Sequence, residues 1–285
     1  AGFACCAETT GGGGRVSYLS PSGSNSNSGT SVSAPWQTFS RVFSPSAKVL
    51  LPGDTLVLLD GTYTNVTTGL PALDCGPTGN ANNGVRGNPI TIKAQTERQA
   101  HLAVTRAVMD TFSLSNCSYY TIEGLWGSNT DVDGPPTWLG RVFAFANVDH
   151  VQVRRILAQH PNSLDTTRDP NLGGRNVGNV GIENSNNVLI EDSEAYDYHR
   201  HGFGVWQSRY VTMRRNYANA RGPYAGSRGS FVLYGSSDSI VENCIAEGNA
   251  GQFSIIGIET TNTSIPTQCV GGTNNDAYCT VNSEC

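Results

Sequence analysis

Five copies of one short pattern fill residues 112–241: Phe112-Ser-Leu114, Phe143-Ala-Phe145, Val180-Gly-Ile182, Phe203-Gly-Val205 and Phe231-Val-Leu233. Two positions after each copy comes Asn116, Asn147, Asn184, Gln207 or Gly235, and eight positions after it comes Ile122, Val153, Ile190, Met213 or Val241. The eight-residue step is constant, whereas successive copies begin 31, 37, 23 and 28 residues apart. A strand–bend–strand unit of fixed length, joined by loops of free length, is typical of a solenoid.

The alternation of side chains along each predicted strand assigns residues to columns. Side chains alternate between the two faces of a strand, and stacked coils lie ~4.8 Å apart, so equivalent positions of successive coils touch. We expect two inward columns from the five copies, a third from Tyr120, Val151, Val188, Val211 and Ser239, and a fourth from the Ile122 series. We also expect the Asn116 column to face inward at the bend, with its amides hydrogen-bonded along the axis. The sequence therefore predicts an all-β parallel β-helix.

A column of alternating charge follows the fourth inward column. It comprises Glu123, Arg154, Glu191, Arg214 and Glu242. Opposite charges on neighbouring strands stabilise a sheet by ~0.2–1 kcal/mol per pair. This column predicts a structural ladder rather than a ligand-binding site.

The flanking segments divide the chain into three parts. Residues 1–34 are rich in Gly, Ser and Asn and are predicted to form an irregular arm. Residues 35–258 are predicted to form the β-helix, of about seven coils including a short helix over 35–43 that covers the first coil, a buried strand over 55–63 and a last strand over 253–258. Residues 259–285 carry Cys269, Cys279 and Cys285 and are predicted to form a Cys-rich tail.

Several motifs near the N-terminus carry a family resemblance. They are Tyr18-Leu-Ser-Pro-Ser-Gly-Ser, Pro35-Trp-Gln-Thr-Phe, Pro52-Gly-Asp54, Asp60-Gly-Thr-Tyr63 and Asn88-Pro-Ile-Thr-Ile-Lys-Ala94. They resemble the opening of secreted right-handed parallel β-helix proteins of the chondroitinase B and alginate lyase type. The resemblance implies a right-handed solenoid and a polysaccharide as partner. The lyases of that group use a Lys base with an Arg partner near calcium, but Lys48 and Lys93 both precede the central coils here, so the lysine mechanism does not carry over.

Composition places the chain among exported proteins. Eight Cys without a CxxC motif or zinc-ligand spacing predict disulfides in an oxidising, extracellular compartment. The net charge of −5 argues against a nucleic acid as partner. The sequence contains no run of ~20 apolar residues, so no membrane span is predicted. Residues 141–228 nevertheless carry a charge of +3, with 11 Arg and 8 acidic residues. Because the guanidinium fork suits carboxylate and sulfate, this region favours either an anionic partner or a surface network of Arg–Glu pairs.

The longest predicted loops leave the coils at 124–142 and 155–179, and the densest titratable cluster follows them. That cluster runs from Glu194 to His201. Proton abstraction beside a uronate carboxylate needs a base, an acid and a neutralising cation. We assign these roles to His199 or His201, to Tyr198, and to Arg200 or Arg221, and the alternative is a solvated turn without a catalytic role.

Further candidate ligands lie on the predicted loops and outward positions. The expected substrate-binding residues are Arg175, Arg228, Trp126, Trp138 and Trp206, with Tyr217 and Tyr234 as further exposed aromatic residues. The side chains of Asp131 and Asp133 match the first half of a calcium loop, although Gly140 stands where such a loop has its Glu. The competing interpretation of this segment is an acidic turn.

Two hypotheses of function follow from these patterns. The first is a secreted carbohydrate-active β-helix that binds an acidic polysaccharide, either cleaving it by β-elimination or only binding it. The second is a non-catalytic extracellular structural or adhesive protein that self-associates end to end, through bare coil ends or terminal Cys, into filaments. A glycoside hydrolase ranks third, since it needs two neighbouring carboxylates.

Overall fold

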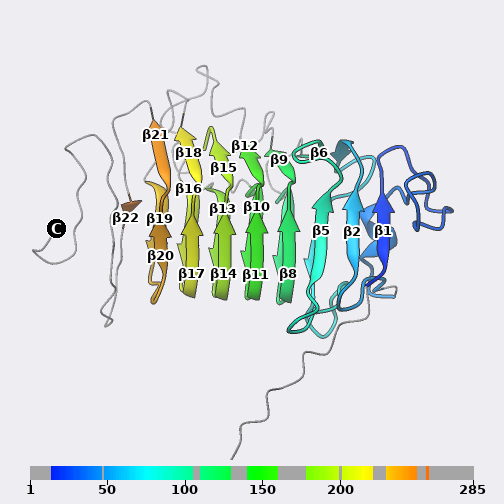
Figure 1. Ribbon diagram of the computed structural model, residues 1–285, viewed down its shortest axis with the longest axis horizontal. Helices are drawn as coiled ribbons and strands as arrows, with labels where there is room; N and C mark the ends of the chain where they lie inside the picture. The colour runs from blue at the N-terminus through cyan, green and yellow to red at the C-terminus, as the bar shows by residue number, and fades with distance from the viewer. Residues whose placement is uncertain are drawn as a thin grey trace, which may run out of the picture.

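The computed structural model winds the chain into stacked coils of three short strands each (Figure 1). It describes residues 14–46, 48–104, 110–129, 140–159, 178–198, 201–220, 229–248 and 255–256. The strands form three parallel sheets, each running the length of the stack. This architecture is the right-handed parallel β-helix that the repeats and the resemblance predicted.

Within the described ranges, β1 belongs to sheet A alone, and each coil from β2 onward contributes one strand to each of three sheets. Sheet A comprises β1 (Val16–Leu19), β2 (Thr55–Leu58), β5 (Ile90–Ala94), β8 (Ser118–Glu123), β11 (Asp149–Arg154), β14 (Asn186–Glu191), β17 (Arg209–Arg214) and β20 (Ile240–Glu242). Sheet B comprises β3 (Gly61–Thr64), β6 (Ala100–Val104), β9 (Trp126–Asn129), β12 (Leu157–Gln159), β15 (Glu194–Tyr196), β18 (Tyr217–Ala220) and β21 (Ile245–Gly248). Sheet C comprises β4 (Ala72–Asp74), β7 (Phe112–Ser115), β10 (Phe143–Ala146), β13 (Gly178–Glu183), β16 (His201–Trp206), β19 (Gly229–Tyr234) and β22 (Ile255–Ile256).

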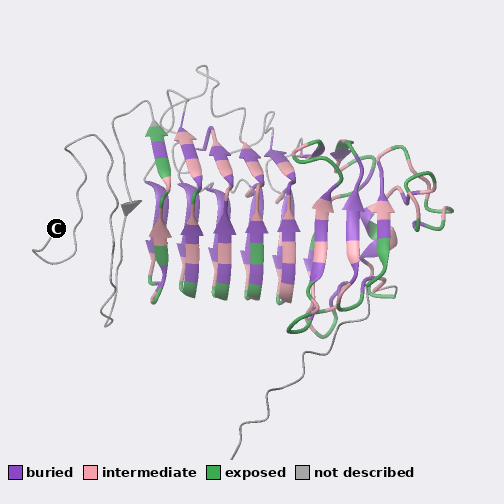
Figure 2. Ribbon diagram, in the orientation of Figure 1, coloured by how far each residue is buried: buried purple, intermediate pink, exposed green. Residues whose placement is uncertain are grey.

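The inward columns form one continuous hydrophobic core. Phe112, Phe143, Val180, Phe203 and Phe231 are paired in register along sheet C, and each is at most 1% exposed. Every strand from β1 to β19 carries buried residues (Figure 2). The other three predicted columns are buried as well, except for Val241, which is partly buried at the end of the fourth. The four predicted inward columns are therefore confirmed up to that last position.

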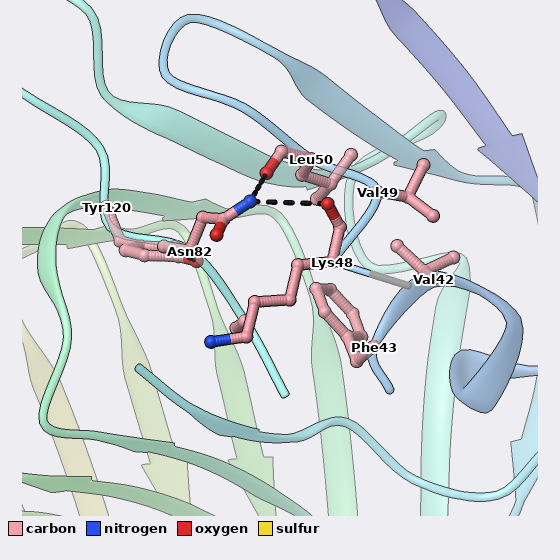
Figure 3. A pocket seen from close by; sticks show the side chains of 8 residues that line it. Val42, Phe43, Lys48, Val49, Leu50, Asn82 and Tyr120 are labelled. Carbon is pink, nitrogen blue, oxygen red and sulfur yellow. Dashed lines mark hydrogen bonds between the residues drawn. The ribbon is translucent and has the colours of Figure 1, made fainter. Parts of the chain in front are cut away.

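The short helix α1 (Phe39–Val42) covers the first coils, as predicted, and buries Phe39 and Val42. The ring of Phe39 packs 5.7 Å from that of Tyr63 on β3. The cap is also tied to the coils at a small, mainly apolar pocket (Figure 3). There Asn82 donates through Nδ2 to the backbone oxygens of Lys48 and Leu50, at 3.2 and 2.8 Å.

Four sequence-based expectations were wrong in detail. Strand β1 lies inside the predicted irregular arm and pairs with β2. The predicted strand over 55–63 is two strands, β2 and β3, which belong to different sheets. The predicted loops at 124–142 and 155–179 contain β9 and β12. The Asn116 column faces solvent, because the chain turns outward at these bends.

The bends nevertheless explain the choice of Asn. Asn116, Asn147 and Asn184 adopt φ of 55°, 53° and 49°, a left-handed conformation that Asn tolerates better than most residues. Asn147 donates through Nδ2 to Asn116 Oδ1 at 3.1 Å, so one of the predicted hydrogen bonds along the axis forms, on the outer surface. Inside the same bend, the buried Ser208 hydroxyl oxygen accepts the N–H of Ser185 at 3.0 Å.

The charge column is in register, as predicted, and its ion pairs converge on Glu191. The Glu191 side chain is 9% exposed and is contacted by Arg154, Arg214 and Arg215 at 3.5, 2.7 and 2.9 Å. Glu123 pairs instead with Arg155, the residue after the predicted partner.

We expect Glu191→Gln to lower the free energy of unfolding by about 1–2 kcal/mol, because it leaves three neighbouring guanidinium groups without their shared counter-charge. The matched control is Glu242→Gln, which lies in the same column but has no side-chain ion pair within the described part of the chain. Denaturant unfolding at low and high salt measures both variants. Equal losses for the two variants would contradict a stabilising role for the ladder.

Candidate functional site

The outer face of sheet C carries a cluster of aromatic and charged side chains that we call the sheet C platform. It consists of Arg141, Glu183, His201, Trp206 and Tyr234. Glu183, Trp206 and Tyr234 end three adjacent strands and are paired in register. Each follows a residue of the buried core and is itself only partly buried, so the three side chains face outward.

Two glycines allow side chains of the platform to approach the sheet closely. A Cβ atom at Gly204 would lie 2.3 Å from the Trp206 ring, and one at Gly181 would lie 2.6 Å from Arg141 Cδ. The indole of Trp206 and the stem of Arg141 therefore occupy the space that side chains would fill at these positions. Substituting either glycine would displace the side chain above it.

The aromatic groups of the platform pack against one another. The rings of Trp206 and Tyr234 are near parallel, at 19°, with centroids 6.0 Å apart. The Arg141 guanidinium lies 5.2 Å from the Trp206 ring, and the His201 ring packs edge-on against Trp206 and Tyr234 at 5.7 and 5.8 Å. These contacts restrict the side chains before any ligand binds.

Arg141 also connects two carboxyl groups. Its guanidinium forms an ion pair with Glu183, and its backbone N–H donates to Asp110 Oδ1 at 2.7 Å. Burial raises the pKa of the Asp110 carboxyl, the nearby charge of Glu183 raises it further, and Arg141 opposes both effects. The platform thus places one partly buried carboxyl of raised pKa beside one that is paired with an arginine.

The predicted catalytic cluster at 194–201 does not converge on one surface, because it spans the corner between sheets B and C. Glu194 and Tyr196 lie on sheet B, where the Tyr196 hydroxyl donates to Glu194 at 2.7 Å. Tyr198 is fully buried, its hydroxyl is hydrogen-bonded to Ser230 at 2.7 Å, and burial raises its pKa to about 12. That position removes Tyr198 from contact with a substrate, and we leave it out of the proposed site. His201 is the described member of the predicted set that belongs to the platform, but it is 1% exposed, because its ring packs against Trp206 and Tyr234. Its burial likewise argues against direct contact with a substrate, so His201 supports the aromatic side chains of the platform.

The expected aromatic ligands are divided between two sheets. Trp126 lies on sheet B, stacked on His101 with ring centroids 3.6 Å apart, whereas Trp206 lies on sheet C. Tyr217 likewise belongs to sheet B and Tyr234 to sheet C. The remaining predicted site residues, namely His199, Arg200, Arg221, Arg175, Arg228, Trp138, Asp131 and Asp133, lie outside the described residues.

Sequence reasoning missed Asp110, Arg141 and Glu183. Glu183 follows the inward Ile182 directly and so occupies the same outward position as Trp206. That position in the repeat was a usable signal. Asp110 and Arg141 each lie two residues before the first Phe of their copy, Phe112 and Phe143, so they occupy the same position in the repeat. That spacing was a second usable signal.

Within the described ranges, no group of three or more His, Cys, Asp or Glu side chains is arranged to hold a metal ion. The predicted calcium ligands Asp131 and Asp133 lie outside those ranges, so calcium binding stays a prediction. No helix in the described part of the chain is both long and apolar enough to cross a bilayer.

Comparison with known proteins supports the fold. No protein-family model matches the sequence, and no curated protein matches it either. The structure is similar to pectate lyase Pel9A, with a TM-score of 0.51 and 17% identity over 82% of this chain and 62% of that one. It is also similar to a rhamnogalacturonan lyase, with a TM-score of 0.50 and 16% identity over 86% of this chain and 66% of that one. The chain thus spans less than two thirds of each lyase, and at this identity the likeness establishes the parallel β-helix fold alone.

Proposed function

We propose that this protein binds a polysaccharide chain along the outer face of sheet C. The observation that carries the proposal is the stacked pair of aromatic rings at Trp206 and Tyr234, which is held beside a charged Arg141–Glu183 pair. Sugar rings present an apolar face that packs on such aromatic surfaces, while their hydroxyl groups bond to neighbouring charged side chains. The rings lie on adjacent strands, so consecutive contacts follow the axis of the stack, as an extended chain requires.

An acidic polysaccharide and an extracellular location are parts of the same proposal. The disulfide between Cys75 and Cys117 supports an oxidising compartment. The acidic class of substrate rests on the positive charge of residues 141–228, including Arg175, Arg221 and Arg228. Arg141 adds little to this, because Glu183 already neutralises it.

A binding panel tests the proposal. We expect wild-type protein to be retarded in affinity electrophoresis by at least one of polygalacturonate, alginate, chondroitin sulfate, xylan or laminarin. Trp206→Ala should weaken that binding by about 10-fold or more, because a stacking contact and its buried area are lost. Gly204→Ala, which keeps the indole but displaces it, should weaken binding in the same direction.

Trp126→Ala is the matched control, because it removes a partly buried tryptophan from a different sheet. Its binding should equal that of the wild type. Equal losses in the Trp126 and Trp206 variants would contradict a site on sheet C, and no retardation by any of the five polysaccharides would contradict the proposed function.

Self-association into filaments is the alternative function, and it stays a prediction. It concerns the coil ends and the terminal cysteines, and Cys5, Cys6, Cys269, Cys279 and Cys285 lie outside the described residues. Non-reducing gels and electron microscopy test it, and discrete monomers under oxidising conditions would contradict it.

A further inference from the structure

Asp110 and Glu183 both contact Arg141, Asp110 at its backbone N–H and Glu183 at its guanidinium, but the two carboxyl groups differ in their surroundings. The Glu183 side chain is 37% exposed and paired with the guanidinium, whereas Asp110 is partly buried and held by the backbone N–H. Asp110 Oδ1 accepts that bond, and Oδ2 has no hydrogen bond within the described ranges. One carboxyl oxygen of Asp110 is therefore available to carry a proton.

Two neighbouring carboxyl groups in unlike environments can divide the roles of acid and base between them. Burial and the charge of Glu183 favour the neutral form of Asp110, and ion pairing with Arg141 favours the charged form of Glu183. Arg141 and Glu183 are the titratable groups whose charges reach Asp110 within the described ranges. Glu183 is paired in register with Trp206, whereas Asp110 precedes β7, which β10 and β13 separate from the strand of Trp206.

We propose that Asp110 and Glu183 form the acid–base pair of a glycoside hydrolase site on the sheet C platform. The inference rests on the proposed function, because the bond to be cleaved belongs to the polysaccharide bound there. Asp110 gives its proton to the glycosidic oxygen as the bond from that oxygen to the anomeric carbon breaks. A water molecule adds to the anomeric carbon and loses its proton to Glu183. The products are two shorter chains, one with a new reducing end. Glu183 then releases its proton to solvent, and Asp110 takes up a proton from solvent.

Hydrolysis fits the described side chains better than β-elimination does. Elimination from a uronate needs a cation to neutralise the sugar carboxylate, together with a base for the proton at C5. Arg141 is the arginine of the platform, and it is already paired with Glu183. The carboxyl pair, by contrast, supplies both groups that hydrolysis requires.

The products distinguish the two reactions. The five polysaccharides of the binding panel are incubated with the protein in water enriched in ¹⁸O, and new reducing ends and the ultraviolet absorbance of unsaturated sugars are followed together. We expect new reducing ends that carry ¹⁸O, without unsaturated product. Unsaturated product without ¹⁸O would overturn the inference in favour of elimination.

Two variants test the roles of the carboxyl groups. Asp110→Asn should lower kcat on polysaccharide by about 10²–10⁴-fold, the usual contribution of a general acid. It should retain most activity on dinitrophenyl glycosides, whose leaving group needs no proton. Glu183→Gln should lose activity on both kinds of substrate. Asp238→Asn, which alters an exposed carboxylate on the sheet A side, is the matched control and should behave as wild type.

The pH profile gives a further readout that a merely structural role would not produce. Wild-type activity should fall as pH rises through the raised pKa of Asp110, because the acid loses its proton. Asp110→Asn should lack this alkaline limb on the dinitrophenyl substrate. Equal losses of Asp110→Asn on both substrates, or an unchanged alkaline limb, would overturn the assignment.

The outcomes separate this inference from the proposed function. If a polysaccharide binds through Trp206 but wild-type protein releases no reducing ends, the binding function stands and the acid–base pair is refuted. If no polysaccharide binds, both fail. Binding measured for Asp110→Asn should match that of the wild type, since the substitution preserves shape and hydrogen bonding to Arg141.

Discussion

Replacing Phe203 by alanine is expected to lower the free energy of unfolding by about 3–5 kcal/mol, the range for a fully buried phenylalanine. Phe203 is 0% exposed, and its ring stacks on that of Phe231 at 5.2 Å and 5°. Strand β16, which carries Phe203, is hydrogen-bonded in register to β13 on one side and to β19 on the other. These strands therefore cannot move together to fill the cavity without breaking that register. The cost should therefore approach the upper part of the range.

Denaturant unfolding measures this loss of stability, and two further variants serve as controls. Phe203→Leu keeps most of the volume and should cost much less than the alanine variant. Ile240→Ala, at a position 48% exposed on β20, should change stability by less than about 0.5 kcal/mol. A cost below about 1.5 kcal/mol for Phe203→Ala would show that the coils relax around the cavity and that the stacked core is less rigid than its packing indicates.

The same phenylalanine column explains which part of the fold could be predicted from the sequence. Sheets A and C present large inward side chains at a constant eight-residue step, and both were predicted. The central part of sheet B was missed because its inward residues are small: from β9 onward, Gly127, Ala158, Ala195, Ala218 and Ala246 continue a column that begins with Tyr63 and Leu102. A Cβ at Gly127 would lie 2.8 Å from the Phe143 ring. The bulk of sheet C therefore requires small residues on the facing sheet, and small residues give no hydrophobic pattern.

The candidate site shows a similar division between local pattern and assembly. Trp206 was predicted as a ligand-binding residue because its outward position follows from the repeat. The ion pair between Arg141 and Glu183 joins residues 42 positions apart, across the longest interval between two copies of the repeat, 37 residues. The course of the Arg141 side chain also depends on Gly181, whose role appears only when the coils are stacked. Local sequence could identify the aromatic surface, but not the carboxyl pair that the coils bring beside it.

Removing the disulfide between Cys75 and Cys117 is the second change with a large expected effect. The bond closes a loop with a sequence separation of 42 and joins the segments that follow β4 and β7. In the described part of sheet C, β4 is the edge strand and has β7 as its neighbour. The loss of chain entropy in the unfolded state corresponds to about 4 kcal/mol for a loop of this length. We expect Cys75→Ala with Cys117→Ala to lower the free energy of unfolding by about 2–4 kcal/mol.

Reduction provides the control for this prediction, because it breaks the bond without changing the sequence. Dithiothreitol should destabilise the wild type by about as much as the double substitution does, and it should affect the double variant less than the wild type. Hydrogen exchange should show the largest loss of protection in β4, since that strand has a single ladder in the described sheet. Uniform loss of protection along all coils would contradict a local clamp. In a solenoid each coil contacts only its neighbours, so a bond at one edge stabilises the far coils only through the chain of interfaces between them.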